Sequence, residues 1–212
     1  MEKLTIRLRG NFACWADPNS RPHYHSYKIP TESALKGIVD NIYYHPENEN
    51  FDLVFDKIIF IKKPQDYRLS FNGKESGRKN AGIANITYHI LADIDFAVSF
   101  YLRKKRALST DEMKLMCKYH NSIKNRIEKN RSFYRLYFGK NEYPATYELV
   151  ENIDEITPID WTEDFGCMFW KYIHDGHYKT SKVKGVSIWT NARIDKGVVI
   201  VPNDEQLREF CY

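Results

Sequence analysis

The chain has 212 residues, a mean hydropathy of −0.59 and no run of about 18 apolar residues, which argues against a protein built from transmembrane helices. Hydrophobic residues make up 42% of the sequence and charged residues 28%, so disordered and low-complexity classes are also excluded. The net charge of +4 permits a polyanionic partner without requiring one, and the aromatic content of 15% can supply a core or surfaces on which bases stack.

The first predicted element is a strand at residues 3–9, where apolar residues alternate with Arg7 and Arg9. This strand has one buried face and one basic face. After a polar stretch, Thr31 is positioned to cap a helix that ends near Tyr43, because Pro46 disfavours helical backbone just before it. The apolar residues at helical spacing in this segment are Ala34, Leu35, Ile38, Val39 and Ile42.

Residues 53–62 predict a buried strand, and residues 72–85 predict a flexible, basic, glycine-containing loop. Apolar residues then occupy every second position from Ile86 to Leu102, the strongest β signal in the sequence. This pattern indicates either one long or bent strand or two strands joined at Ala92–Asp93.

Ser109 and Glu112 have the spacing of a capping box that opens a second helix. At 100° per residue, His120 lies on the apolar face of this helix and points inward. A further strand is expected at residues 132–139, and the rest of the chain contains a GVVIVP strand near its end.

The order strand, helix, strands, helix, strand is typical of an α+β domain of ferredoxin-like type, with both helices on one side of an antiparallel sheet. We expect this domain to span residues 1–145 and a small β-rich domain to span residues 146–212. A sheet of this kind with basic and aromatic residues on its free face is a common platform for single-stranded RNA.

Several classes of chemistry lack their motifs. The close histidine pairs, His23-x-His25 and His174-x-x-His177, have no accompanying cysteines or carboxylate set, so surface turn histidines are the simpler interpretation and no metal site is expected. The sequence has no Walker loop and no GxSxG elbow. The scattered cysteines and a start that lacks a signal-segment pattern predict reduced thiols and a cytoplasmic location; the cysteines are Cys14, Cys117, Cys167 and Cys211.

Acid–base cleavage of RNA needs no metal or cofactor, because the 2′-hydroxyl is the nucleophile and the protein only aligns it, moves protons and stabilises the phosphorane charge. Tyr43 and His120 would converge if the two helices share one face of the sheet. The simpler alternatives are a satisfied buried imidazole for His120 and an aromatic packed on the core for Tyr43.

Basic residues recur beside aromatic residues and glycines, which favours contact with phosphates over an ordinary solvated surface. The candidate RNA-binding residues are Arg7, Arg9, Lys74, Arg78, Lys79, Lys124, Arg126 and Arg131, with a further basic run at 103–106.

Four segments resemble, in order and spacing, the CRISPR-associated family-five proteins of subtype d: GNFACWADP (10–18), SYKIPTESALKGIVDNIYYHP (26–46), KYHNSIKNR (118–126) and LYFGKNEYPA (136–145). They lie in the first two thirds of the chain. The resemblance implies a RAMP-type protein with an RRM-like domain and a small C-terminal β domain. It also implies a subunit of type I-C Cascade that cuts precursor CRISPR RNA at the repeat hairpin without metal and keeps the 5′ handle.

The family's catalytic tyrosine looks like Tyr43 and its histidine looks like His120. The family lysine directly precedes that histidine, whereas here Tyr119 holds that position and the nearest preceding lysine is Lys118. Two residues along a helix is about 200°, so Lys118 and His120 cannot face one phosphate from a regular helix. Lys118 could serve if the helix begins later or bulges; alternatively, Lys124, one turn beyond His120, could supply the charge.

Three hypotheses follow. The first is an endoribonuclease that uses Tyr43, His120 and Lys118 or Lys124; the second is a non-catalytic subunit that binds the 5′ handle; the third is a protein-assembly module. The partners implied by the resemblance are CRISPR repeat RNA and the backbone and large subunits of Cascade, with contact to target DNA left open and no membrane partner expected.

Overall fold

The computed structural model describes residues 2–18, 20, 23–44, 51–74, 83–174 and 182–211. Two helices and nine strands are assigned within these ranges. The strands are β1 (Leu4–Ala13), β2 (Phe51–Phe60), β3 (Gln65–Lys74), β4 (Ile83–Lys104), β5 (Thr146–Val150), β6 (Glu163–His174), β7 (Val183–Ile194), β8 (Val198–Ile200) and β9 (Leu207–Cys211). The helices are α1 (Glu32–Ile42) and α2 (Thr110–Glu128), with short 3₁₀ turns at Ile153–Glu155 and Asp204–Gln206.

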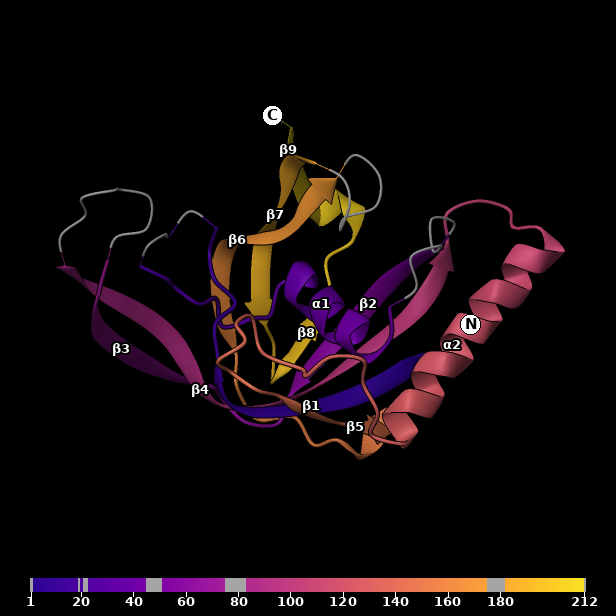
Figure 1. Ribbon diagram of the computed structural model, residues 1–212, viewed down its shortest axis with the longest axis horizontal. Helices are drawn as coiled ribbons and strands as arrows, with labels where there is room; N and C mark the ends of the chain where they lie inside the picture. The colour runs from indigo at the N-terminus through magenta and orange to yellow at the C-terminus, as the bar shows by residue number, and fades with distance from the viewer. Residues whose placement is uncertain are drawn as a thin grey trace.

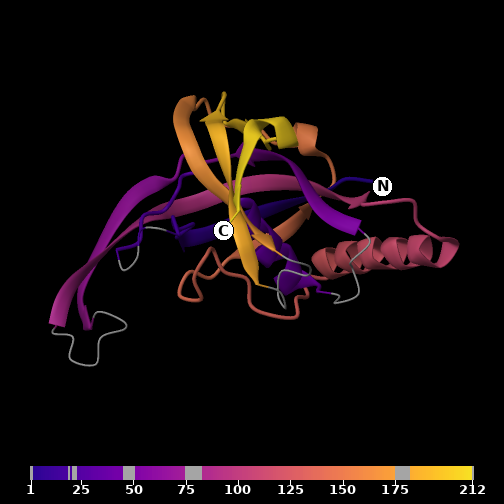
Figure 2. The same ribbon diagram turned by 90° about the horizontal axis from the view of Figure 1, so that it is seen from above.

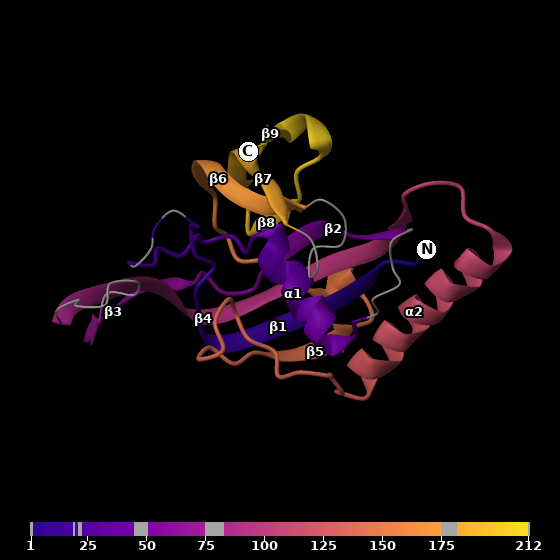
Figure 3. The same cartoon turned by 45° about the horizontal axis from the view of Figure 1, so that its top comes forward.

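The larger sheet is antiparallel in the order β5-β1-β4-β2-β8 (Figure 1). Helix α1 lies over β1 and β4, between α2 and the smaller sheet (Figure 3). The fold is therefore α+β, a mostly antiparallel sheet with two helices, as the sequence predicts.

Strand β4 is a single strand of 22 residues, which confirms the long-strand interpretation. It bends at Asp93, whose φ of 59° lies in the left-handed region that Asp tolerates better than most residues. Beyond this bend, the first half of β4 pairs with β3 and forms a two-stranded arm that extends away from the sheet (Figures 1 and 2). The expected loop at 72–85 is thus partly strand, since 72–74 end β3 and 83–85 begin β4; residues 75–82 lie outside the described part of the chain.

The strand expected at 132–139 is wrong. Apolar residues do alternate into the core here, since Leu136 and Phe138 are 2% and 0% exposed. The chain nevertheless turns back at Gly139 and forms only an isolated bridge between Tyr137 and Pro144. Gly139 has a φ of 81°, and a Cβ atom there would overlap the backbone of Cys14, so only glycine allows the turn. Residues 132–139 are held by burial of these side chains, and the next strand is β5.

The smaller sheet has the order β6-β7-β9 and is joined to the rest by β8, which pairs with β2, and by an edge-to-face contact between Trp161 and Phe60. Trp170 and Trp189 pack together within it, with ring centres 5.3 Å apart. Buried residues of both sheets and both helices form one continuous hydrophobic core.

Candidate functional site

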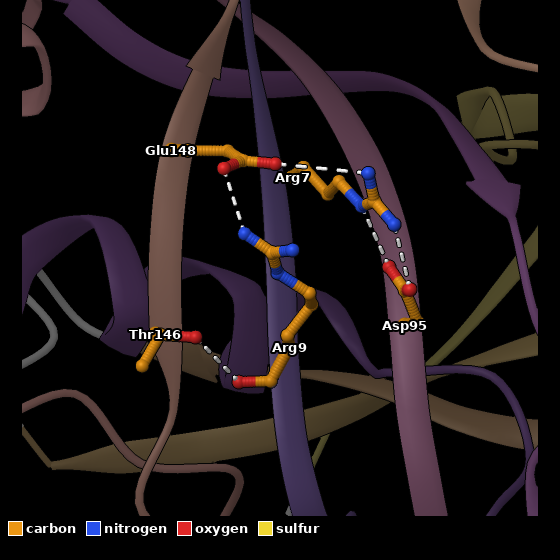
Figure 4. A network of polar contacts seen from close by, with 5 residues as sticks. All are labelled: Arg7, Arg9, Asp95, Thr146 and Glu148. Carbon is orange, nitrogen blue, oxygen red and sulfur yellow. Dashed lines mark hydrogen bonds and ion pairs between the residues drawn. The ribbon is translucent and has the colours of Figure 1, made fainter.

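The basic face of β1 is neutralised by carboxylates from neighbouring strands (Figure 4). Arg7 Nε and Nη2 each donate a hydrogen bond of 2.8 Å to Asp95, whose side chain is 7% exposed, and Arg9 Nη2 donates one of 2.7 Å to Glu148. The bonds to Asp95 raise the pKa of Arg7 above its ordinary value. Both arginines are therefore paired within the fold, and the Arg9 side chain is still 46% exposed.

Of the basic residues predicted around the glycine loop, Lys74 lies within the described part of the chain. Lys74 ends β3 at the outer end of the arm, opposite α2 along the long axis of the molecule (Figure 1). Arg78 and Lys79 fall within 75–82, outside the described residues. Where the structure describes them, the predicted RNA-binding residues thus divide into a pair on β1, Lys74 at the end of the arm, and a group on and directly after α2.

His120 lies on the inner face of α2 and is 5% exposed. Its Nε2 is 3.1 Å from the carbonyl oxygen of Glu2, and because a carbonyl only accepts, Nε2 is the donor. Its Nδ1 lies 3.5 Å from Asn121 Oδ1, at the outer limit of a hydrogen bond. The hydrogen bond from Nε2 therefore ties His120 to the N-terminal segment.

The two lysines considered with His120 differ in position. Helix α2 is regular from Thr110 to Glu128, so Lys118 lies on the side away from His120 and is exposed. Lys124 lies one turn from His120, and its Nζ is 3.5 Å from Glu2 Oε2. The geometric argument against Lys118 and His120 facing one phosphate therefore holds in the folded helix.

Tyr43 is the C-cap of α1, where its backbone N–H donates to the carbonyl oxygen of Val39. The Tyr119 hydroxyl donates to the Tyr43 carbonyl oxygen at 3.3 Å, and the two rings lie 5.3 Å apart. The guanidinium carbon of Arg126 lies 5.1 Å from the ring centre of Tyr43 and 4.0 Å from that of Phe133. Arg126 follows Tyr119 by seven positions, which places both on one face of α2, so the cation beside Tyr43 is Arg126.

The segment that follows α2 completes this group. The backbone N–H groups of Phe133 and Tyr134 both donate to the Asn41 carbonyl oxygen, at 2.9 and 3.0 Å, and so satisfy a carbonyl left open at the end of α1. The Phe133 ring stacks on that of Tyr43 at 5.6 Å. Sequence reasoning missed Phe133, Tyr134 and Arg135 because the segment was interpreted as a strand; the basic–aromatic pattern RSFYR was the available signal.

A groove of about 870 Å³ lies between α1, the start of β2 and the smaller sheet, and Tyr119 is part of its lining. Carboxylates outnumber cations along its described lining, which disfavours a phosphate backbone there. The carboxylates are those of Glu32, Asp40, Asp52, Asp56, Asp204 and Glu209, and the cations are Lys36, Arg103, Lys105 and Lys171.

Metal-ligand clusters of three or more side chains are absent from the described ranges. His25 stacks on His89 with ring centres 4.4 Å apart, and His23 Nδ1 accepts a hydrogen bond from the Thr87 backbone. His174 lies at the end of β6, while its sequence neighbour His177 falls outside the described part. All four cysteines are free thiols, and within the same ranges no helix is long and apolar enough to cross a membrane.

Comparisons with known proteins give a consistent picture. The chain is 26% identical to the CRISPR pre-crRNA endoribonuclease Cas5d of Thermus thermophilus over 153 residues, which cover 69% of this chain and 64% of the relative. It is 21% identical to the protein of the same name from Mannheimia succiniciproducens, over 94% of this chain and 95% of the relative.

Two solved structures share the fold. A CRISPR-associated protein matches with a TM-score of 0.67 and 20% identity, over 97% of this chain and 94% of the other. A chain of a CRISPR RNA-guided surveillance complex matches with a TM-score of 0.51 and 9% identity, over 95% and 90% of the two chains. The family model described as CRISPR-associated protein (Cas_Cas5), in its Cas5d form, matches residues 3–196. Because that match spans most of the sequence, the chain belongs to the Cas5d family of CRISPR-associated proteins.

Proposed function

We propose that this chain is the CRISPR RNA-binding subunit of a type I-C Cascade, and that it cleaves precursor CRISPR RNA at the repeat hairpin by attack of a 2′-hydroxyl and retains the 5′ handle. The observation that carries the proposal is the match of the Cas5d family model over residues 3–196. Both curated relatives bear the name pre-crRNA endoribonuclease, and the similarity to one of them extends over 94% of this chain.

The architecture proposed for this role is a ferredoxin-like domain followed by a smaller β-rich domain. The strand order β5-β1-β4-β2 supports it, because a βαββαβ chain has this order when the β3–β4 arm is treated as an insertion. The boundary between the two domains was expected between residues 145 and 146. The pairing of β5 with β1 favours a boundary after Val150, because β5 then belongs to the first domain.

The chemistry proposed for the site is acid–base catalysis by Tyr43 and His120 with a nearby cation. Lys118 is the cation candidate from the family resemblance, and Arg126 is the candidate from geometry, since its guanidinium carbon lies 5.1 Å from the Tyr43 ring centre. For His120 to reach RNA, its hydrogen bond to the Glu2 carbonyl must open. Displacement of this N-terminal residue by RNA is therefore part of the proposal.

Cleavage of the repeat RNA in EDTA is the direct test. We expect a product ending in a 2′,3′-cyclic phosphate and a rate lowered about 100-fold or more by His120→Asn, because loss of a general acid or base typically has that effect. Tyr43→Phe, which keeps the ring contacts and removes only the hydroxyl, is the second variant if burial of His120 makes its replacement unfold the chain. Lys118→Ala and Arg126→Ala distinguish the two cation candidates.

A non-catalytic subunit that holds the 5′ handle is the second candidate function. The burial of His120 and the outward direction of Lys118 favour it. Under this alternative the wild-type chain binds repeat RNA with a steep dependence on salt and leaves it intact. Intact RNA together with tight binding would therefore replace the first proposal by the second.

The partners proposed in either case are CRISPR repeat RNA and the backbone and large subunits of Cascade. Contact with target DNA within the complex is a further hypothesis. A cytoplasmic location also stays part of the proposal; four free thiols fit a reducing compartment.

A further inference from the structure

Two large aromatic side chains are exposed directly after α2. Phe133 is 52% exposed and Tyr134 is 67% exposed, and they are adjacent in the chain. Exposed rings are not unusual singly, but two neighbours on a fixed backbone form an apolar surface that water solvates poorly. Aromatic faces of this kind can stack on the flat rings of a ligand.

The backbone beneath these rings is held rigidly. The N–H groups of Phe133 and Tyr134 share the Asn41 carbonyl oxygen, and the Arg131 N–H donates to the Arg126 carbonyl oxygen at 2.8 Å. The Phe133 ring is further fixed by its stack on Tyr43 and by the Arg126 guanidinium. The rings therefore need little ordering when a ligand binds, which favours affinity.

The surroundings of the rings are cationic. Residues 129–135 have the sequence KNRSFYR, which contains Lys129, Arg131 and Arg135 and no carboxylate. All three side chains are exposed. An aromatic surface within such a cluster suits a ligand that combines flat apolar rings with negative charge.

We propose that Phe133 and Tyr134 form a stacking site for unpaired bases of RNA, with Arg131 and Arg135 contacting the adjoining phosphates. Base stacking on aromatic side chains with cations along the backbone is the general mode of single-strand binding. A protein partner is disfavoured because three exposed cations lie within seven residues here. Such a partner would have to supply several acidic groups to pair with them, or bury them unpaired. This inference rests on the RNA-binding role proposed above and names the residues that read its single-stranded part.

The test replaces each unpaired nucleotide of the repeat RNA, one at a time, by 2-aminopurine or by an abasic unit. In the wild-type chain we expect quenched fluorescence at one or two positions, and at those positions an abasic unit should weaken binding about tenfold. Tyr134→Ala and Phe133→Leu should remove the quenching and weaken binding of intact RNA by a similar factor. In these variants an abasic unit should then have no further effect.

Phe210→Ala is the matched control, because Phe210 is 53% exposed and lies in β9 of the smaller sheet. If wild-type chain binds repeat RNA and the Phe133 and Tyr134 variants bind it equally well with unchanged fluorescence, the stacking site is wrong while the proposed function stands. If wild-type chain binds no RNA, the proposed function itself fails. Retained RNA binding with lost binding of a Cascade subunit would assign the surface to a protein partner and overturn the inference.

Discussion

The arginines of β1 and those at the end of α2 carry the same charge in different environments. Arg7 and Arg9 have carboxylate oxygens at 2.8 and 2.7 Å, supplied by Asp95 and Glu148 from adjacent strands. Arg126 instead lies over two aromatic rings, one of them half-exposed. From this comparison we expect that pairing across the sheet, rather than the number of basic residues, decides which cations are available to a polyanion.

The largest effect that tests this comparison is a loss of stability in Arg7→Ala. Removal of the guanidinium leaves Asp95 as an unpaired, nearly buried carboxylate, so we expect the free energy of unfolding to fall by about 3 kcal/mol. The measurement is the denaturant midpoint by circular dichroism.

Arg9→Ala is the matched control for that change, because the Arg9–Glu148 pair is about half exposed and should contribute less than about 1 kcal/mol. The double variant Arg7→Ala/Asp95→Ala should regain part of the lost stability, since it also removes the buried charge. A weaker affinity for RNA in Arg7→Ala or Arg9→Ala at full folding would contradict the view that these arginines act within the fold.

The next effect is on RNA binding by Arg126→Ala. We expect about tenfold weaker binding and a salt dependence reduced by about one counterion, because one cation is removed from the RNA surface. Stability should change by about 1 kcal/mol at most, the usual size of an exposed cation–π contact. The RNA affinity of Arg126→Lys should lie between those of wild type and Arg126→Ala, because lysine keeps the charge but lacks the planar group that stacks on the rings.

Arg9→Ala again serves as the control, now for RNA affinity, because it removes one positive charge from a paired position. Filter binding at several salt concentrations compares the two variants directly. Equal losses of affinity in Arg9→Ala and Arg126→Ala would show that total charge, and not the environment of each arginine, governs binding.

The parts of the fold that follow from local sequence were predictable. Thr31 caps α1, Ser109 and Glu112 form the capping box of α2, and the alternation that ends at Leu102 lies in one strand. Strand β3 was missed although Tyr67, Leu69 and Phe71 alternate in it, because these apolar residues stay partly exposed and the intervening residues are polar. A two-stranded arm buries little apolar surface, so its strands do not need the strongly apolar sequence that marks a core strand.

The candidate site was predictable only residue by residue. The inward direction of His120 follows from helical periodicity, and Tyr43 was correctly expected at the end of α1. The partners of these residues were not, because Glu2 lies 118 positions from His120 and Tyr43 lies 76 from Tyr119. Contacts at such separations depend on the packing of the whole sheet and leave no local pattern.

The smallest predicted effect concerns Arg106, which lies near the N-terminal end of α2 and extends the comparison of paired and unpaired arginines. Arg106, from the basic run at 103–106, donates to Glu112 at 2.7 Å, so it belongs with the internally paired arginines. The Ser109 backbone N–H, with further help from Arg106, holds the pKa of Glu112 below its ordinary value. A carboxylate with a lowered folded pKa adds stability above its unfolded pKa of about 4.3 and loses that contribution as pH falls through the folded value.

Glu112→Gln should therefore lower the denaturant midpoint slightly at pH 7, and the difference from wild type should shrink as pH falls below about 4. Because the substitution removes a negative charge beside Arg106, RNA affinity should not fall. Ser109→Ala is the control, since it removes the reciprocal hydrogen bond to the Glu112 N–H without changing charge. A midpoint difference that persists unchanged at pH 3 would mean that the carboxylate's charge contributes nothing and would remove Arg106 from the internally paired class.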